Sequence, residues 1–114
     1  MKEILLKILS SFGYPVFLQG TLNADKAYPE SFITFFVSYS EDNAHYDDEV
    51  HSVDWHISVM FYSSSPKLVN TKPFEILKAL KNAGFIPQGK GNDLISDEPT
   101  HTGWAIDYRY IEIQ

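Results

Sequence analysis

Residues 50–62, VHSVDWHISVMFY, decide the fold because they alternate large apolar residues with mostly polar ones. Successive side chains of a β-strand point to opposite faces of a sheet, so this period of two predicts a strand with one buried face. That face carries Val53, Trp55, Ile57, Val59 and Phe61, and the other carries Asp54, His56, Ser58 and Met60. Residues 31–40, SFITFFVSYS, are equally rich in β-branched and aromatic residues. We expect the two segments to form a long antiparallel hairpin, joined by the polar, acidic connection Glu41–Glu49.

A helix and a short strand are predicted before this hairpin. Apolar residues at i, i+4 spacing within residues 4–12 predict an amphipathic helix, and Gly13 is placed to end it in the left-handed conformation. A short strand, Val16–Gln19, and a polar loop, Gly20–Glu30, then lead to the hairpin.

A second helix is expected from Thr71 or Lys72 to Gly84. An interior proline removes a hydrogen bond and clashes with the preceding turn, at about 3 kcal/mol or more, so Pro73 predicts a break. Residues 66–70 are therefore expected to form a separate short turn after a serine cap. The buried stripe of this helix is predicted to contain Phe74, Ile76, Leu77, Leu80 and Ala83.

The C-terminal part completes the predicted fold. It reads as a short edge strand, Phe85–Pro87, an irregular loop, Gln88–Thr100, and a final strand, Thr102–Ile113. The order of elements predicts a single α+β domain, residues 1–114. We expect an antiparallel sheet of about four strands with two helices packed mainly on one face.

The composition excludes several classes of function. The 114 residues contain no cysteine, which removes disulfide frameworks, thiolate metal sites and thiol enzymes and is ordinary for a reducing compartment. A formal net charge of −6 opposes direct nucleic-acid binding, which needs a positive face. Residues 1–12 lack the features of a signal peptide, and no run approaches about 18 apolar residues. We expect a protein that neither spans a membrane nor is secreted by a signal peptide.

No set of residues predicts catalysis, a cofactor or a metal ion. His51 and His56 lie five residues apart on the predicted strand, so they face opposite sides and form no helical i, i+4 ligand pair. Asp97 and His101 could be drawn as an acid–base set, but adjacent polar residues in a loop are a common coincidence. We expect that the protein is not an enzyme and has no catalytic, cofactor-binding or metal-binding residue.

The sheet is predicted to carry more bulky side chains than two short helices can cover. Aromatic residues make up 15% of the chain, and many of them lie on both faces of the predicted strands. Self-association is the simplest way to cover the bulky side chains that the helices leave exposed. The residues in question are Phe32, Phe36, Met60, Tyr62, Trp104, Tyr108 and Tyr110.

Four stretches of the sequence carry a resemblance to a known group of proteins: FITF at residues 32–35, WHISVMFY at 55–62, LKNAGF at 80–85 and DEPTHTGW at 97–104. Together they resemble small proteins encoded in the head–tail gene region of long-tailed phages and prophages of Gram-positive bacteria. The resemblance covers nearly the whole chain in the order of its elements.

The resemblance to the tail terminator and tail-to-head joining families implies a structural role. In those families an α+β subunit assembles into a ring, often of six subunits, that stops growth of the tail tube and presents a surface to the head connector. The implied partners are further copies of the chain, a tail tube protein and a head connector protein, in the virion and, during assembly, in the host cytoplasm. Two alternatives stay open: another head-completion or assembly protein, and a module that binds a small ligand or peptide.

Two polar segments are the candidate partner-binding sites. The residues are Tyr46, Asp47, Asp48 and Glu49 in the acidic tip of the hairpin, and Lys90, Asn92 and Asp93 in the later loop. Complementary charge would steer assembly and fix its orientation, while aromatic anchors would supply more of the affinity.

Overall fold

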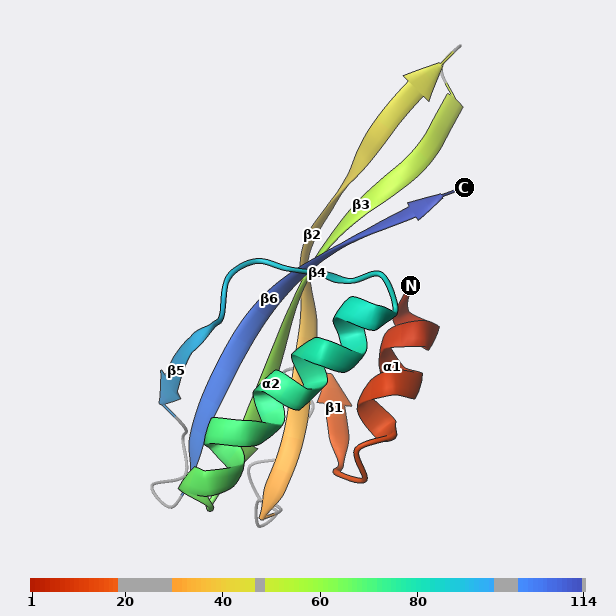
Figure 1. Ribbon diagram of the computed structural model, residues 1–114. Coiled ribbons are helices and arrows are strands. Elements are labelled where there is room, and N and C mark those ends of the chain that lie inside the picture. Colours follow the sequence, from red (N-terminus) through yellow and green to blue (C-terminus); the bar gives the residue numbers. More distant parts are fainter. Residues whose placement is uncertain (19–29, 47–48, 96–100, 114) are drawn as a thin grey trace.

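Figure 1 shows the computed structural model, which describes residues 1–18, 30–46, 49–95 and 101–113. Two helices lie against one face of a twisted sheet, and a narrow hairpin rises beyond them. The elements in chain order are α1 (Lys2–Ser10), β1 (Val16–Leu18), β2 (Ser31–Tyr46), β3 (Glu49–Ser63), α2 (Pro66–Asn82), β4 (Ile86–Pro87), β5 (Asn92–Ile95) and β6 (Thr102–Ile113). The described strands form one sheet in the order β1-β2-β3-β6-β4, with β5 also paired to β6.

The α+β class is confirmed, but the sheet has six strands rather than about four. The strand that was not predicted from the sequence is β5, which falls within the predicted loop Gln88–Thr100. It begins with Asn92 and Asp93, which have low strand propensity, and forms by pairing Asn92 with Ala105 on β6. The short strand β1 runs parallel to β2, pairing Val16 with Ile33, so the sheet is mixed rather than purely antiparallel.

The β2–β3 hairpin is longer than the sequence predicts. β2 continues to Tyr46 and β3 begins at Glu49, where these two residues pair, so most of the predicted connection 41–49 is strand. The apolar alternation stops near residue 40, so the sequence carries no strand pattern beyond it, although the backbone still pairs. We call residues 41–46 and 49–53 the arm.

The arm makes the molecule elongated. Its principal extents are 53 × 29 × 23 Å, and its radius of gyration is 15.3 Å, whereas a compact domain of this length has a radius of about 13 Å. The C-terminal end of β6 accompanies the base of the arm (Figure 1) and pairs Ile113 with Ser52. The amino group of Met1 forms an ion pair with Glu112, which ties the start of α1 to the same place.

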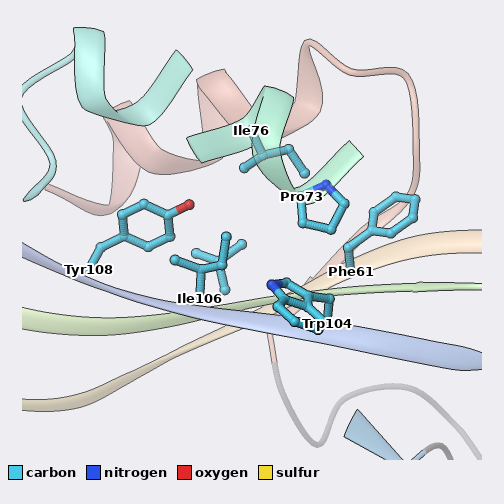
Figure 2. A pocket seen from close by; sticks show the side chains of 7 residues that line it. Phe61, Pro73, Ile76, Trp104, Ile106 and Tyr108 are labelled. Atoms are coloured by element: carbon cyan, nitrogen blue, oxygen red, sulfur yellow. The ribbon is translucent and has the colours of Figure 1, made fainter. Parts of the chain in front are cut away.

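Helix α2 is continuous from residue 66 to residue 82, so the predicted break at Pro73 is wrong. Pro66 lies in the first turn, where a missing N–H is tolerated. Pro73 is buried, and its ring lies over Trp104 and Ile106 of the sheet (Figure 2). Only about 10 Å³ of space remains there, at the lower limit for one water molecule. Burial of the ring therefore offsets part of the cost of the hydrogen bond that the carbonyl of Val69 loses.

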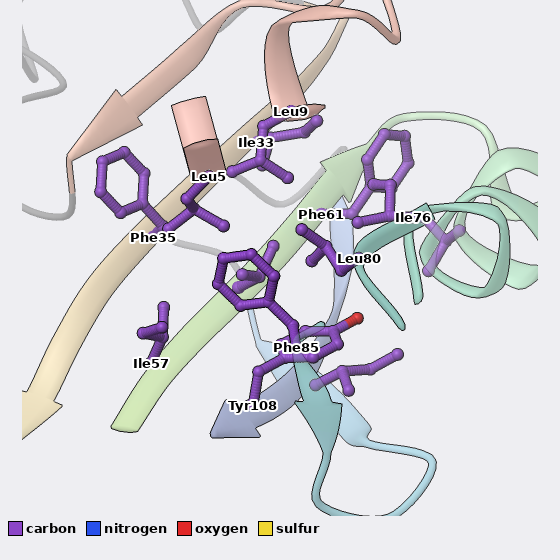
Figure 3. Close-up of a cluster of buried hydrophobic side chains, with 13 residues drawn as sticks. Leu5, Leu9, Ile33, Phe35, Ile57, Phe61, Ile76, Leu80, Phe85 and Tyr108 are labelled. Carbon is purple, nitrogen blue, oxygen red and sulfur yellow. The ribbon is translucent and has the colours of Figure 1, made fainter. Parts of the chain in front are cut away.

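The core lies between the sheet and the two helices (Figure 3). Leu5 and Leu9 of α1 and Ile76 and Leu80 of α2 are almost fully buried. Each such side chain contributes roughly 1.5–3 kcal/mol when it leaves water. The alternation is confirmed from Trp55 to Phe61, because Ile57, Val59 and Phe61 are buried in this core and Trp55 packs against it, whereas Val53 lies outside it. The buried residues from the sheet are Ile33, Phe35, Ile57, Val59, Phe61, Ile106 and Tyr108.

The opposite face of the sheet is less exposed than the sequence predicts. Phe32 and Met60 are only 2% and 3% exposed. The ring of Phe32 stacks on Tyr62 with centroids 5.1 Å apart and lies 6.0 Å from the ring of His101. Phe32 and Met60 thus need no second subunit to cover them, and neither does Tyr108, which lies in the helix-side core. Among the residues whose burial is described, the exposed large apolar ones are Ile4, Leu6, Leu18, Phe74, Ile86 and Ile111.

Candidate partner-binding surfaces

The predicted acidic tip lies at the end of the arm. Tyr46 is the last residue of β2 and Glu49 the first of β3. Asp47 and Asp48, between them, lie outside the described residues. Residues 41–49 contain five acidic residues and no lysine or arginine, so the arm carries a high density of negative charge at neutral pH.

The second predicted segment, around Lys90, lies along the edge of β6. Lys90, Asn92 and Asp93 are all exposed. The indole N–H of Trp104 donates a hydrogen bond of 2.8 Å to the carbonyl oxygen of Lys90, and Asp93 pairs with Trp104 in the β5–β6 ladder. The segment is therefore held to the sheet by its backbone, while its polar side chains face solvent.

The structure does not bring these two predicted sites together. Asn92 pairs with Ala105, which in turn pairs with Met60 of β3. Glu49 lies eleven residues before Met60 on the same strand, a length of roughly 37 Å. The arm tip and the β5 segment thus belong to two separate surfaces of the molecule.

An open groove that the sequence did not predict lies between α2 and β4. Its volume is about 640 Å³. Phe74 and Ile86 leave 41% and 46% of their surface exposed, although apolar residues of this size are usually buried. The residues that line it include Phe74, Leu77 and Lys81 of α2, Ile86 and Pro87 of β4, and Lys90.

Exposure of Phe74, and of Ala83 just after the last turn, corrects the predicted buried stripe of α2. The helix buries a narrower side, formed by Val69, Pro73, Ile76 and Leu80. Phe74 lies one position, about 100° around the helix, beyond Pro73. Its ring is 6.1 Å from that of Trp104 at the margin of the helix–sheet contact, and 41% of its surface stays exposed. The sequence did carry a sign that Phe74 would be exposed. The predicted apolar residues of α2 together with Pro73 cover a wider part of the helix surface than a single sheet can bury.

The groove is positively charged within a negatively charged chain. Among the described residues that line it, Lys81 and Lys90 are basic and none is acidic, whereas the whole chain has a formal charge of −6. Lysine stems also cover apolar surface while keeping their ammonium groups in water. The groove is thus suited to a partner that is both apolar and acidic.

A buried carboxylate lies on the sheet face opposite the helices. Asp54 of β3 is 4% exposed and forms an ion pair with Arg109 of β6, with Nη2 2.6 Å from Oδ2. Nε2 of His56 lies 3.5 Å from Oδ1 of the same carboxylate. The hydrogen bond from Arg109 lowers the pKa of Asp54 even though burial opposes the shift. This arrangement neutralises the carboxylate and joins two strands, so it supports a structural role.

The described residues offer no metal centre built from three or more histidine, aspartate or glutamate side chains. His101 is buried beside the ring of Phe32. Asp97, which the sequence offered as its possible acid–base partner, lies outside the described residues. Burial raises the pKa of Tyr108, which keeps this core hydroxyl protonated. That the protein is not an enzyme stays a prediction.

No protein-family model matches the chain, and no curated protein matches it either. In the part of the chain that the structure describes, neither helix combines the length and hydropathy needed to cross a membrane. The fold and its surfaces define a small α+β domain with a protruding acidic arm and an apolar, basic groove.

Proposed function

We propose that this protein is a structural subunit of a phage or prophage tail, a tail terminator or head–tail joining protein that forms a ring at the tail end. The observation that carries the proposal is the presence of a protruding acidic arm and an apolar, basic groove on one subunit. These surfaces differ in shape and charge, so a contact between them is heterologous. A heterologous contact closes a ring when its repeated rotation adds up to one full turn, and the proposal is that it does so here.

The edges of the hairpin support the same assembly. β1 pairs with β2 only from Ile33 to Phe35. Among the described residues, the outer edge of β2 has no strand beside it from residue 36 to the tip. An open edge presents backbone N–H and C=O groups that a neighbouring subunit can pair. The resemblance of four sequence stretches to tail terminator and joining proteins supplies the biological setting.

Electron microscopy tests the role directly. Purified protein is mixed with phage tails that lack this component, and the tail ends are imaged. A density at one end of each tail, absent without the protein, is the expected result. Protein that binds nowhere on the tail, or along its whole length, contradicts a terminator or joining role.

Charge reversal at the arm tip tests which surface makes the contact. The variant Asp47→Lys, Asp48→Lys, Glu49→Lys should fold normally but join heads to tails poorly, because opposite charge steers and orients the complex. A matched control reverses three acidic residues elsewhere, Glu3, Glu75 and Asp107, which changes the net charge equally. If the control impairs joining as much as the tip variant, the tip has no specific role.

The second candidate function is a peptide-binding module, and the groove of about 640 Å³ is the observation that favours it. Such a module would be monomeric at all concentrations and would bind no tail end. A ring subunit would form larger species as concentration rises or when a tail is present. Light scattering across a concentration series, with and without tails, distinguishes the two. The other head-completion or assembly roles differ in where the protein binds on the particle.

A further inference from the structure

The groove between α2 and β4 has a chemistry that defines its partner. Phe74 and Ile86 are two of the six large apolar residues that the described chain leaves exposed, and they lie in the same groove. Exposed apolar residues gathered in this way mark interaction sites. Lys81 and Lys90 add positive charge, so the preferred occupant carries acidic groups beside apolar ones.

The arm of the same protein has this complementary chemistry. Residues 41–49, EDNAHYDDE, carry five acidic residues, and among them Tyr46 is of the aromatic type enriched at interfaces. The described strand 41–46 is about 20 Å long. It is a narrow element of two strands that projects from the domain (Figure 1).

The arm cannot fill the groove of its own subunit. Ile86 of β4 pairs with Arg109 of β6, and Arg109 pairs with His56 of β3. Along β3, the groove is therefore at the position of His56. Glu49 lies seven residues further along β3, roughly 24 Å away. The paired strands of the arm lead away from α2 and β4, the elements that line the groove (Figure 1). An arm that fills a groove therefore comes from another copy.

We propose that the groove binds the arm of a second copy of this chain, head to tail. The inference rests on the proposed ring and specifies its interface: each subunit gives one arm and receives one. In a closed ring no arm and no groove is left unoccupied. The acidic arms attract the lysines of the neighbouring groove, and this attraction offsets the repulsion between subunits that each carry a net negative charge.

The absence of cysteine from the chain allows a direct test by disulfide formation. Two single variants, Glu49→Cys in the arm and Lys81→Cys in the groove, are mixed at equal concentration and oxidised. The control pair replaces Lys81→Cys by Lys7→Cys, an exposed lysine on α1. We expect about tenfold more mixed disulfide dimer from the arm–groove pair, because bound partners have a high effective concentration.

Charge exchange provides a second test that needs no cross-link. Lys81→Glu with Lys90→Glu should weaken self-association by about tenfold or more, since two attractive contacts become repulsive. Glu41→Lys, Asp42→Lys and Glu49→Lys in the mixing partner should restore it. Lys2→Glu with Lys7→Glu, on α1, is the control with the same charge change and should associate normally. Circular dichroism checks that all variants are folded.

The outcomes separate this inference from the proposed function. If rings form but the arm–groove pair cross-links no better than the control, the groove inference is wrong and the ring stands. If the protein neither self-associates nor binds tail ends, both are wrong. If added tail tube protein, and not a second copy, shields the Lys81→Cys thiol from alkylation, the groove belongs to the tube protein and the inference is overturned.

Discussion

The guanidinium of Arg109 donates hydrogen bonds to both carboxylate oxygens of Asp54, with Nε 2.9 Å from Oδ1 and 2.7 Å from Oδ2. The two residues come from β6 and β3, and Asp54 pairs with Glu41 at the start of the arm. A buried carboxylate without such a partner is strongly destabilising. The ion pair therefore fixes the two central strands together at the point where the arm leaves the sheet.

The first prediction concerns the pH dependence of stability. Because Arg109 lowers the pKa of Asp54 below its ordinary value of 3.8 in the folded protein, the charged form favours folding. This contribution is complete above pH 3.8 and is lost as the pH falls through the folded-state pKa. At neutral pH, Asp54→Asn should lose roughly 1–3 kcal/mol of unfolding free energy, and the loss should shrink as the solution becomes more acidic.

Urea unfolding followed by tryptophan fluorescence at a series of pH values measures this effect. Asp107→Asn is the control, because Asp107 is an exposed carboxylate on the same strand as Arg109. Its unfolding free energy should stay within about 0.5 kcal/mol of the parent at every pH. A deficit of Asp54→Asn that is the same at acid and neutral pH would show that its charge is not the stabilising feature.

The second prediction concerns Pro73 in the middle of α2. Replacing an interior proline by alanine gains about 3 kcal/mol of helix propensity, while removing two buried ring carbons loses roughly 1.6 kcal/mol. Pro73→Ala should therefore raise the unfolding free energy by about 1 kcal/mol. Thermal and urea unfolding check the value. A decrease of that size would mean that the contact of the ring with Trp104 and Ile106 outweighs the helix term.

The parts of the fold that follow from sequence are those in which burial is periodic. Ile57, Val59 and Phe61 alternate with polar residues because one face of β3 packs against the helices, so their period of two identified the strand. Residues 41–46, EDNAHY, do not alternate apolar with polar residues and gave no such signal. β5 depends on an edge of β6 that β3 does not use, where Asn92 pairs with Ala105. A strand made by a long-range partner is not encoded in its local residues.

The candidate site was predictable only in part, for a similar reason. The acidic character of residues 41–49 is visible in the sequence. The groove is not, because it requires Phe74 of α2 and Ile86 of β4 to line one surface without covering each other. Phe74 has the spacing of a core residue, and only the tertiary fold reveals that Pro73 takes the inward position beside it.

The third prediction compares two glycines in the segment that leads into β5. Gly89 and Gly91 both have positive φ, +89° and +96°, which costs a residue with a Cβ about 1–2 kcal/mol. At Gly89 nothing lies within 4 Å of an added Cβ, whereas at Gly91 it would collide with the carbonyl oxygen of Ala105 and the indole of Trp104. Gly91→Ala should lose roughly 2–4 kcal/mol of unfolding free energy and Gly89→Ala only about 1 kcal/mol. Urea unfolding of both variants measures the difference; equal losses would mean that β5 shifts on β6 without cost and that backbone strain alone sets the requirement for glycine.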